Sequence, residues 1–193
     1  MIIPVFTVLV NLWLTMQGRL GFFHADIGGR FVMAGLVWYI LTCTQGTIQA
    51  LPVVQRVTHL NNWVIAHSHI GVFGFSGMIA LGGLYYMLPR ITGKPLYSNL
   101  LADVQYWLLV LGMAGFFMVL TAGGLIQGNA WLNGTTVYRT LPMIHIYFIL
   151  RAAVGVLIVG AAFIGLYNVI RTIRGEQAQG ERIFGDVLQG EPQ

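Results

Sequence analysis

The sequence has very little charge. Charged residues make up 8% of the 193 residues, whereas a soluble domain carries about 25%. Only two acids, Asp26 and Asp103, precede the segment from Glu176 onward, and hydrophobic residues make up 56% of the chain. So little polar surface excludes an ordinary soluble protein. We therefore expect an all-α integral membrane protein with about five transmembrane helices. Its expected partner is the lipid membrane.

Two further absences narrow the class of protein. The single cysteine, Cys43, lies in an apolar stretch and excludes an intramolecular disulfide. The apolar and polar alternation of β-barrel strands is missing. The net charge of +4 comes from basic residues scattered between apolar stretches. That distribution is typical of orientation charges in a membrane chain, so no nucleic-acid partner is expected.

Five apolar stretches are candidate membrane spans. A helix needs about 20 apolar residues to cross a hydrocarbon core of about 30 Å. The candidates are residues 1–17, 31–51, 62–88, 104–127 and 141–170. The segments between them are rich in glycine, proline, asparagine or charge, which favours loops. The sequence therefore predicts a transmembrane region over 1–174 and a polar cytoplasmic tail over 175–193. The first stretch has no basic n-region and is interpreted as a helix rather than a signal peptide.

Lysine and arginine predict the orientation. Seven of them lie in the 18–30 and 89–103 segments and from Arg171 onward, and only Arg56 and Arg139 lie in the two opposite loops. Positively charged loops stay in the cytoplasm. A multi-pass chain with its N-terminus outside and its C-terminus in the cytoplasm is therefore expected.

Two histidines stand two residues apart in the third stretch, as His67-Ser68-His69. On a helix they are separated by about 200°, so they point to nearly opposite faces and cannot easily chelate one ion. They could each hold a different metal centre. The alternative is that both are hydrogen-bonded core residues. Gly71, Gly74 and Gly77 follow, and they leave room for close helix packing or for a flat macrocycle.

These residues resemble a known family. The His67-Ser68-His69 segment within WVIAHSHIGVFGFSG is similar to the His-x-His helix of the catalytic subunit I of the haem–copper oxidase superfamily. The longer run THLNNWVIAHSHIGVFGFSGMIALGGLYYMLPRITGKPLYS is most similar to the cbb3-type (C-type) branch. The similarity continues through TQGTIQAL, GGLIQG and the segment that begins at Arg151, and covers most of residues 1–174.

The resemblance implies a function and its residues. His67 is expected to be the proximal ligand of a high-spin haem b, and His69 one axial ligand of a low-spin haem b. The implied protein is a respiratory terminal oxidase of a bacterial or archaeal cell membrane, which reduces O2 to water with electrons from cytochrome c. His59, eight residues before His67, matches a family histidine near the haem propionates; the alternative is a solvated loop histidine. Arg151 lies in a span without acids and is expected to pair with a propionate rather than to snorkel outward.

The resemblance also implies what this chain does not supply. The second ligand of the low-spin haem, the three copper ligands and a cross-linked tyrosine belong to helices upstream of this region in the family. Only the C-terminal half of subunit I is therefore expected here, from a split gene or as a fragment. Activity would require a membrane chain with the N-terminal half, which would bind the copper, together with cytochrome c-type haem subunits.

One position departs from the family pattern. The chain has Gln45 before Gly46, where cbb3-type oxidases commonly have a glutamate. An interhelical hydrogen bond is the plainer interpretation of Gln45. The departure leaves open a nitric oxide reductase, with non-haem iron in place of copper, beside the oxidase. A non-catalytic haem b electron-transfer subunit is the alternative from another class.

Overall fold

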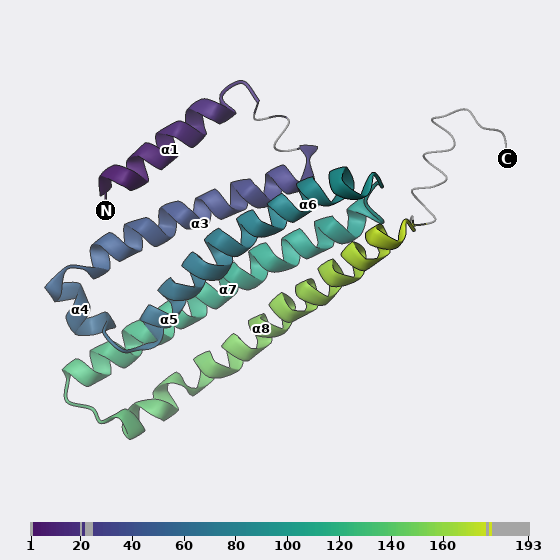
Figure 1. The fold of residues 1–193 in the computed structure, drawn as a ribbon. Helices are drawn as coiled ribbons and strands as arrows, with labels where there is room; N and C mark the ends of the chain where they lie inside the picture. Colours follow the sequence, from purple (N-terminus) through teal and green to yellow (C-terminus); the bar gives the residue numbers. More distant parts are fainter. Residues whose placement is uncertain (1, 20, 22–24, 177, 179–193) are drawn as a thin grey trace, which may run out of the picture.

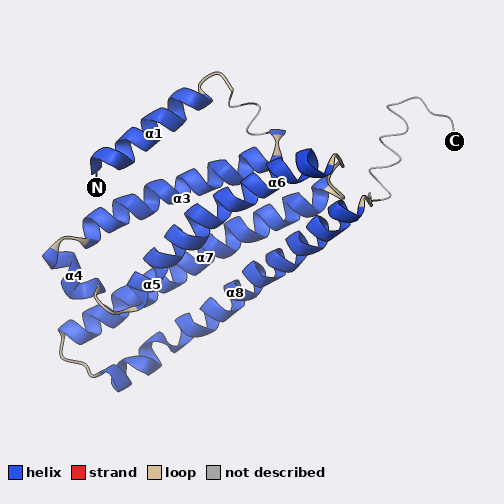
Figure 2. Cartoon of the chain, in the orientation of Figure 1, coloured by secondary structure: helices blue, strands red, loops and turns tan. Residues whose placement is uncertain are grey.

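The computed structural model describes residues 2–19, 21, 25–176 and 178. This part of the chain is helical and contains no strand (Figure 2). The elements in order are α1 (Ile2–Met16), α3 (Ile27–Gln49), α4 (Pro52–Thr58), α5 (Asn62–His69), the π-helix η1 (Ile70–Gly77), α6 (Met78–Thr92), α7 (Asn99–Leu132) and α8 (Val137–Arg174).

Four helices in the described residues are long and apolar enough to cross a membrane. They are α3 with 23 residues, the continuous helix Asn62–Thr92 with 31, α7 with 34 and α8 with 38. Helix α1 has 15 residues and spans about 22 Å, which is less than the roughly 30 Å of a hydrocarbon core. The all-α membrane fold is confirmed, with four long helices and one shorter apolar helix. Most of the expected tail, 175–193, lies outside the described residues.

The long helices lie side by side along their lengths, and each runs opposite to the one before it (Figure 1). Helix α1 lies apart from the others, beside α3. One end of the bundle carries α4 and the turn between α7 and α8. The other end carries the start of α3, the end of α6, the connection between α6 and α7 and the last turn of α8. These segments contain the basic residues Arg30, Arg90, Lys94, Arg171 and Arg174.

Both acids that precede Glu176 have structural partners. Asp26 caps α3, because its Oδ2 accepts the Gly29 N–H at 2.9 Å. Asp103 forms an ion pair with Arg30, which joins α7 to α3. Helix α7 begins at Asn99, five residues before the predicted span. Asp103 therefore belongs to the helix itself rather than to a loop.

The connection between α3 and α5 is more structured than a loop. Helix α4 occupies Pro52–Thr58, with Pro52 at its start, where a missing N–H costs nothing. The chain then turns at Leu60, whose φ of 60° is left-handed and unusual for a residue other than glycine. This turn sets the direction in which the histidine-bearing helix enters the bundle.

Candidate functional site

The start of α5 is fixed against α7. The Asn61 side chain caps the helix by accepting the Trp63 N–H at 2.9 Å. The Asn62 amide donates to Gln127 Oε1 at 2.8 Å. Close approach of the two helices requires glycine at Gly124, where a Cβ atom would lie 2.2 Å from the Trp63 nitrogen. These contacts place the two histidines, one to two turns further on, at a defined depth and rotation.

His67 points toward α3. Its Nδ1 lies 3.3 Å from Gln45 Oε1. Its ring stacks on that of Trp63, with centroids 5.9 Å apart and planes 13° apart. The Cε1 and Nε2 edge of the ring lies above Gly46, where an added Cβ would be 3.5 Å and 3.6 Å from these two atoms. Gly46 therefore places no side chain in front of the second ring nitrogen.

His69 points toward α7 instead. Its ring centroid lies 4.9 Å from that of Phe116. The ring also stacks nearly parallel to that of Phe73, with centroids 6.3 Å apart and planes 9° apart. Its Nδ1 lies 2.8 Å from the Ile65 carbonyl oxygen. A carbonyl only accepts hydrogen bonds, so Nδ1 carries the proton and Nε2 keeps its lone pair. The ring is set up to act as a ligand through Nε2 with aromatic rings on its flanks.

The two rings thus serve different sides of one helix, in keeping with the separation of about 200°. Among the described residues, no three histidine, cysteine or acidic side chains lie close enough together to hold an ion. Directly after His69 the chain winds as the π-helix η1. Such segments are rare and are frequent at functional sites.

His59 follows the last residue of α4, eight residues before His67, and its side chain is exposed. Its Nδ1 is 3.2 Å from Gln55 Oε1. Together with Ala50, Pro52 and Arg56, both residues line a shallow hollow at the end of the bundle that carries α4. Among the described residues, no hydrogen bond joins His59 to His67 or His69.

Arg151 lies on α8 at the depth of the histidines. Contacts with α7 relate positions on α8 to positions on α5. At one level Gly123 and Gly124 of α7 contact Tyr147 of α8 and Trp63 of α5, and at a second level Gly115 and Phe116 of α7 contact Val154 of α8 and His69 of α5. Arg151 lies between Tyr147 and Val154, and so between the levels of Trp63 and His69. Its guanidinium lies 5.0 Å from the Phe148 ring centre, one turn toward the start of α8. No carboxylate in the described part of the chain pairs with it.

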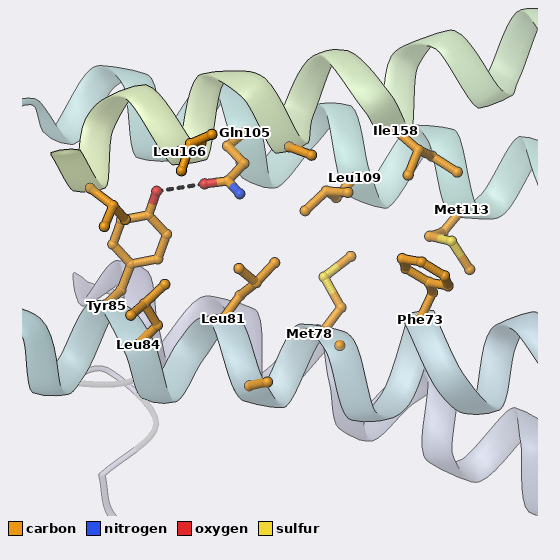
Figure 3. Close-up of a pocket in the computed structure, with 15 residues that line it drawn as sticks. Phe73, Met78, Leu81, Leu84, Tyr85, Gln105, Leu109, Met113, Ile158 and Leu166 are labelled. Carbon is orange, nitrogen blue, oxygen red and sulfur yellow. Dashed lines mark hydrogen bonds between the residues drawn. The ribbon is translucent and has the colours of Figure 1, made fainter.

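A separate apolar cavity of about 440 Å³ opens between α6, α7 and α8 (Figure 3). Its polar contact is the hydrogen bond from Tyr85 Oη to Gln105 Oε1, at 2.5 Å. Neither His67 nor His69 lines it, although Phe73, beside His69, stands at one end. This cavity is therefore a neighbour of the site and not its centre.

The fold and the paired histidines define a multi-helix membrane protein in which one helix presents imidazoles to two sides. The chain belongs to the Cytochrome C and Quinol oxidase polypeptide I family, whose model matches residues 1–157.

Individual relatives agree with the family match. The chain is 28% identical to a cytochrome c oxidase subunit 1 homolog of Agrobacterium tumefaciens (strain T37), over 89% of this chain and 33% of that protein. It is 26% identical to the Cbb3-type cytochrome c oxidase subunit CcoN1 of Stutzerimonas stutzeri, over 86% of this chain and 37% of that protein. It is 27% identical to a cytochrome c oxidase subunit 1 of Thermus thermophilus, over 81% of this chain and 29% of that protein. The chain spans about a third of the length of these relatives.

Several residues that shape the site had no role in the sequence-based prediction. Gln127 and Gly124 lie in the GGLIQG motif. This motif indicated the family, but it did not predict that these two residues contact the start of α5. Phe116 gave no signal, because an aromatic residue in an apolar span is ordinary. The Gln45 side chain was considered for a hydrogen bond, but its partner, His67, is 22 residues away in the sequence.

Proposed function

We propose that this chain is the haem-binding part of the catalytic subunit of a cbb3-type terminal oxidase, which reduces O2 to water with electrons from cytochrome c. The observation that carries the proposal is the opposite orientation of His67 and His69, each with its Nδ1 engaged in a hydrogen bond. The names of the reported relatives favour an oxidase over a nitric oxide reductase.

His67 fits the role of proximal ligand to the high-spin haem. With Nδ1 donating to Gln45, the lone pair lies on Nε2, the atom that faces Gly46. A side chain at position 46 would lie beside Nε2, so the glycine suits a flat macrocycle that approaches the helix backbone closely.

His69 fits the role of axial ligand to the low-spin haem. Its Nε2 is left free by the hydrogen bond from Nδ1 to Ile65. The flanking rings of Phe73 and Phe116 offer an apolar environment, which excludes water from the ligated nitrogen and influences the iron's potential. The two haem b groups would then lie on either side of one helix.

The haem irons, when bound, supply the redox chemistry, and this chain's residues hold and orient them. We propose that the second low-spin ligand and the copper ligands come from a membrane chain that carries the N-terminal half of subunit I. Cytochrome c-type haem subunits would deliver electrons. His59 and Arg151 are proposed to hold propionates. In α8, helical side chains lean toward the N-terminus, and this lean directs Arg151 toward the end of the bundle that carries α4.

The proposed location is a bacterial or archaeal cell membrane. Basic residues gather at the end of the bundle that carries the α6–α7 connection, which is therefore proposed to face the cytoplasm. The opposite end, with α4 and His59, would face outward, and the start of α1 would lie on that outer side.

Replacing each histidine separately in the assembled complex tests the function. His69→Ala should remove the low-spin haem absorption. His67→Ala should leave that absorption and abolish oxygen consumption. His145→Ala, at an exposed position of α8, is the control and should change neither. Loss of the same haem signal in both variants, or of neither, would overturn the proposal.

A further inference from the structure

We propose that Gln45 is a positioning residue for His67: its side-chain oxygen fixes the ring tautomer and keeps the imidazole a neutral iron ligand. This inference rests on the proposed function, because it requires His67 to bind a haem iron. It gives a task to a polar side chain on a neighbouring helix that does not itself touch the metal.

The contact joins two different long helices. Gln45 belongs to α3 and His67 to α5, and a hydrogen bond of 3.3 Å joins Gln45 Oε1 to His67 Nδ1. Gly46, the next residue, lies against the opposite edge of the same ring. Adjacent positions of α3 therefore face the two ring nitrogens: Gln45 binds Nδ1, and Gly46 adds no side chain beside Nε2.

Metal binding selects one orientation of the Gln45 amide. If the amide NH2 group donated to Nδ1, the ring proton would have to reside on Nε2, and Nε2 could not then bind iron. With Oε1 accepting from the Nδ1 N–H, the lone pair remains on Nε2. The amide orientation and the ligand tautomer are thus coupled, as is usual for the outer partners of metal-bound histidines.

The neutral charge of Gln45 has a consequence for the iron. A carboxylate at this position would attract the Nδ1 proton more strongly and bring a negative charge close to the ligand. Both effects make the imidazole a stronger electron donor and disfavour the reduced iron. The amide exerts a weaker pull, so the high-spin haem in this protein should be reduced more easily than with a glutamate in the same place.

The test uses the assembled complex with Gln45→Leu, Gln45→Glu and the control Thr44→Val. Thr44 is the exposed neighbour whose hydroxyl donates within its own helix, to the Ile40 carbonyl. The readouts are the iron–histidine stretching band in the resonance Raman spectrum of the reduced high-spin haem and its midpoint potential. Gln45→Glu should shift the band to higher wavenumber and lower the potential. Gln45→Leu should shift the band to lower wavenumber, and Thr44→Val should change neither readout.

A purely structural role for Gln45 predicts a different result. Gln45→Glu preserves the length of the side chain and its hydrogen-bond acceptor. This variant therefore still tests the proposal if the complex with Gln45→Leu does not assemble. An unchanged band and potential in Gln45→Glu would overturn the positioning role, while loss of oxygen consumption in His67→Ala would leave the proposed function standing. If His67→Ala keeps the iron–histidine band, the proposed function itself fails and the role of Gln45 with it.

Discussion

Gly124 of α7 lies directly against Trp63 of α5, so closely that a Cβ atom on Gly124 would stand 2.2 Å from the Trp63 backbone nitrogen. The obstacle is backbone, which cannot move aside as the end of a flexible side chain can. We expect Gly124→Ala to push α5 away from α7 and to destabilise the bundle by about 1–3 kcal/mol or more. Thermal unfolding of the purified complex and its haem content measure both effects.

Gly83→Ala is the matched control for that substitution. Gly83 lies in the same long helix as the histidines, and an added Cβ there meets nothing within 4 Å. Its stability should equal or slightly exceed that of the original protein, because alanine favours helix more than glycine does. Equal stability of the two variants would mean that α5 and α7 are not in contact at this point.

Gly46→Ala separates haem binding from folding. A methyl group there meets the His67 ring at 3.5 Å or more, an ordinary contact, so the helices should pack as before. The same methyl group occupies the space in front of Nε2 that a macrocycle needs. We expect high-spin haem to be reduced or lost while low-spin haem remains, as measured by optical spectra.

The control for Gly46→Ala is Gly160→Ala in α8, where an added Cβ meets nothing within 4 Å. It should retain both haems. A full complement of high-spin haem in Gly46→Ala would show that the haem does not approach α3 at this residue.

Arg151→Gln should lower the midpoint potential of a nearby haem. A cation favours the reduced iron, which carries one positive charge less, and an interaction across roughly 10 Å of protein is worth on the order of 1–2 kcal/mol at an effective dielectric constant of about 20. The expected shift is therefore tens of millivolts downward, with both haems still bound. Redox titration followed by absorption measures it.

Arg139→Gln removes the same charge from an exposed position at the start of α8 and provides the comparison. Solvent and salt screen that charge, so its effect should be much smaller. Equal haem midpoint potentials in the two variants would show that Arg151 does not lie near a haem.

Thiol labelling tests the orientation. In a Cys43→Ser background, Arg56→Cys and Arg90→Cys place one reactive group at each end of the bundle, and both positions are exposed. A reagent that cannot cross membranes should label Arg56→Cys in intact cells and Arg90→Cys only in inverted vesicles. The reverse pattern would place the basic end outside.

The long helices were predictable because apolar length alone selects them, whereas their ends and the short helix α4 were not. Helix α7 extends to Leu132, beyond the predicted end at residue 127, because a helix continues past the hydrocarbon core where polar side chains can be solvated. The pair on opposite faces, His67 and His69, followed from helix rotation, which is a local property. The hydrogen bond between Gln45 and His67 depends on how α3 and α5 align, and no periodicity within either helix encodes that alignment.

The π-helix η1 separates two parts of one long helix that have different tasks. The hydroxyl of Ser76 donates to the Gly71 carbonyl, five residues earlier, where an α-helical turn would bring residues four apart together. If residues 70–77 wound as an α-helix instead, each would advance by about 100° rather than by the smaller step of a wider turn, and α6 would be rotated relative to α5. Tyr85 would then turn away from Gln105, although neither histidine had moved. The wider turns of η1 therefore set the rotation of α6 relative to α5, so that the ligand-bearing turn and the packing surface of α6 each face their own neighbours.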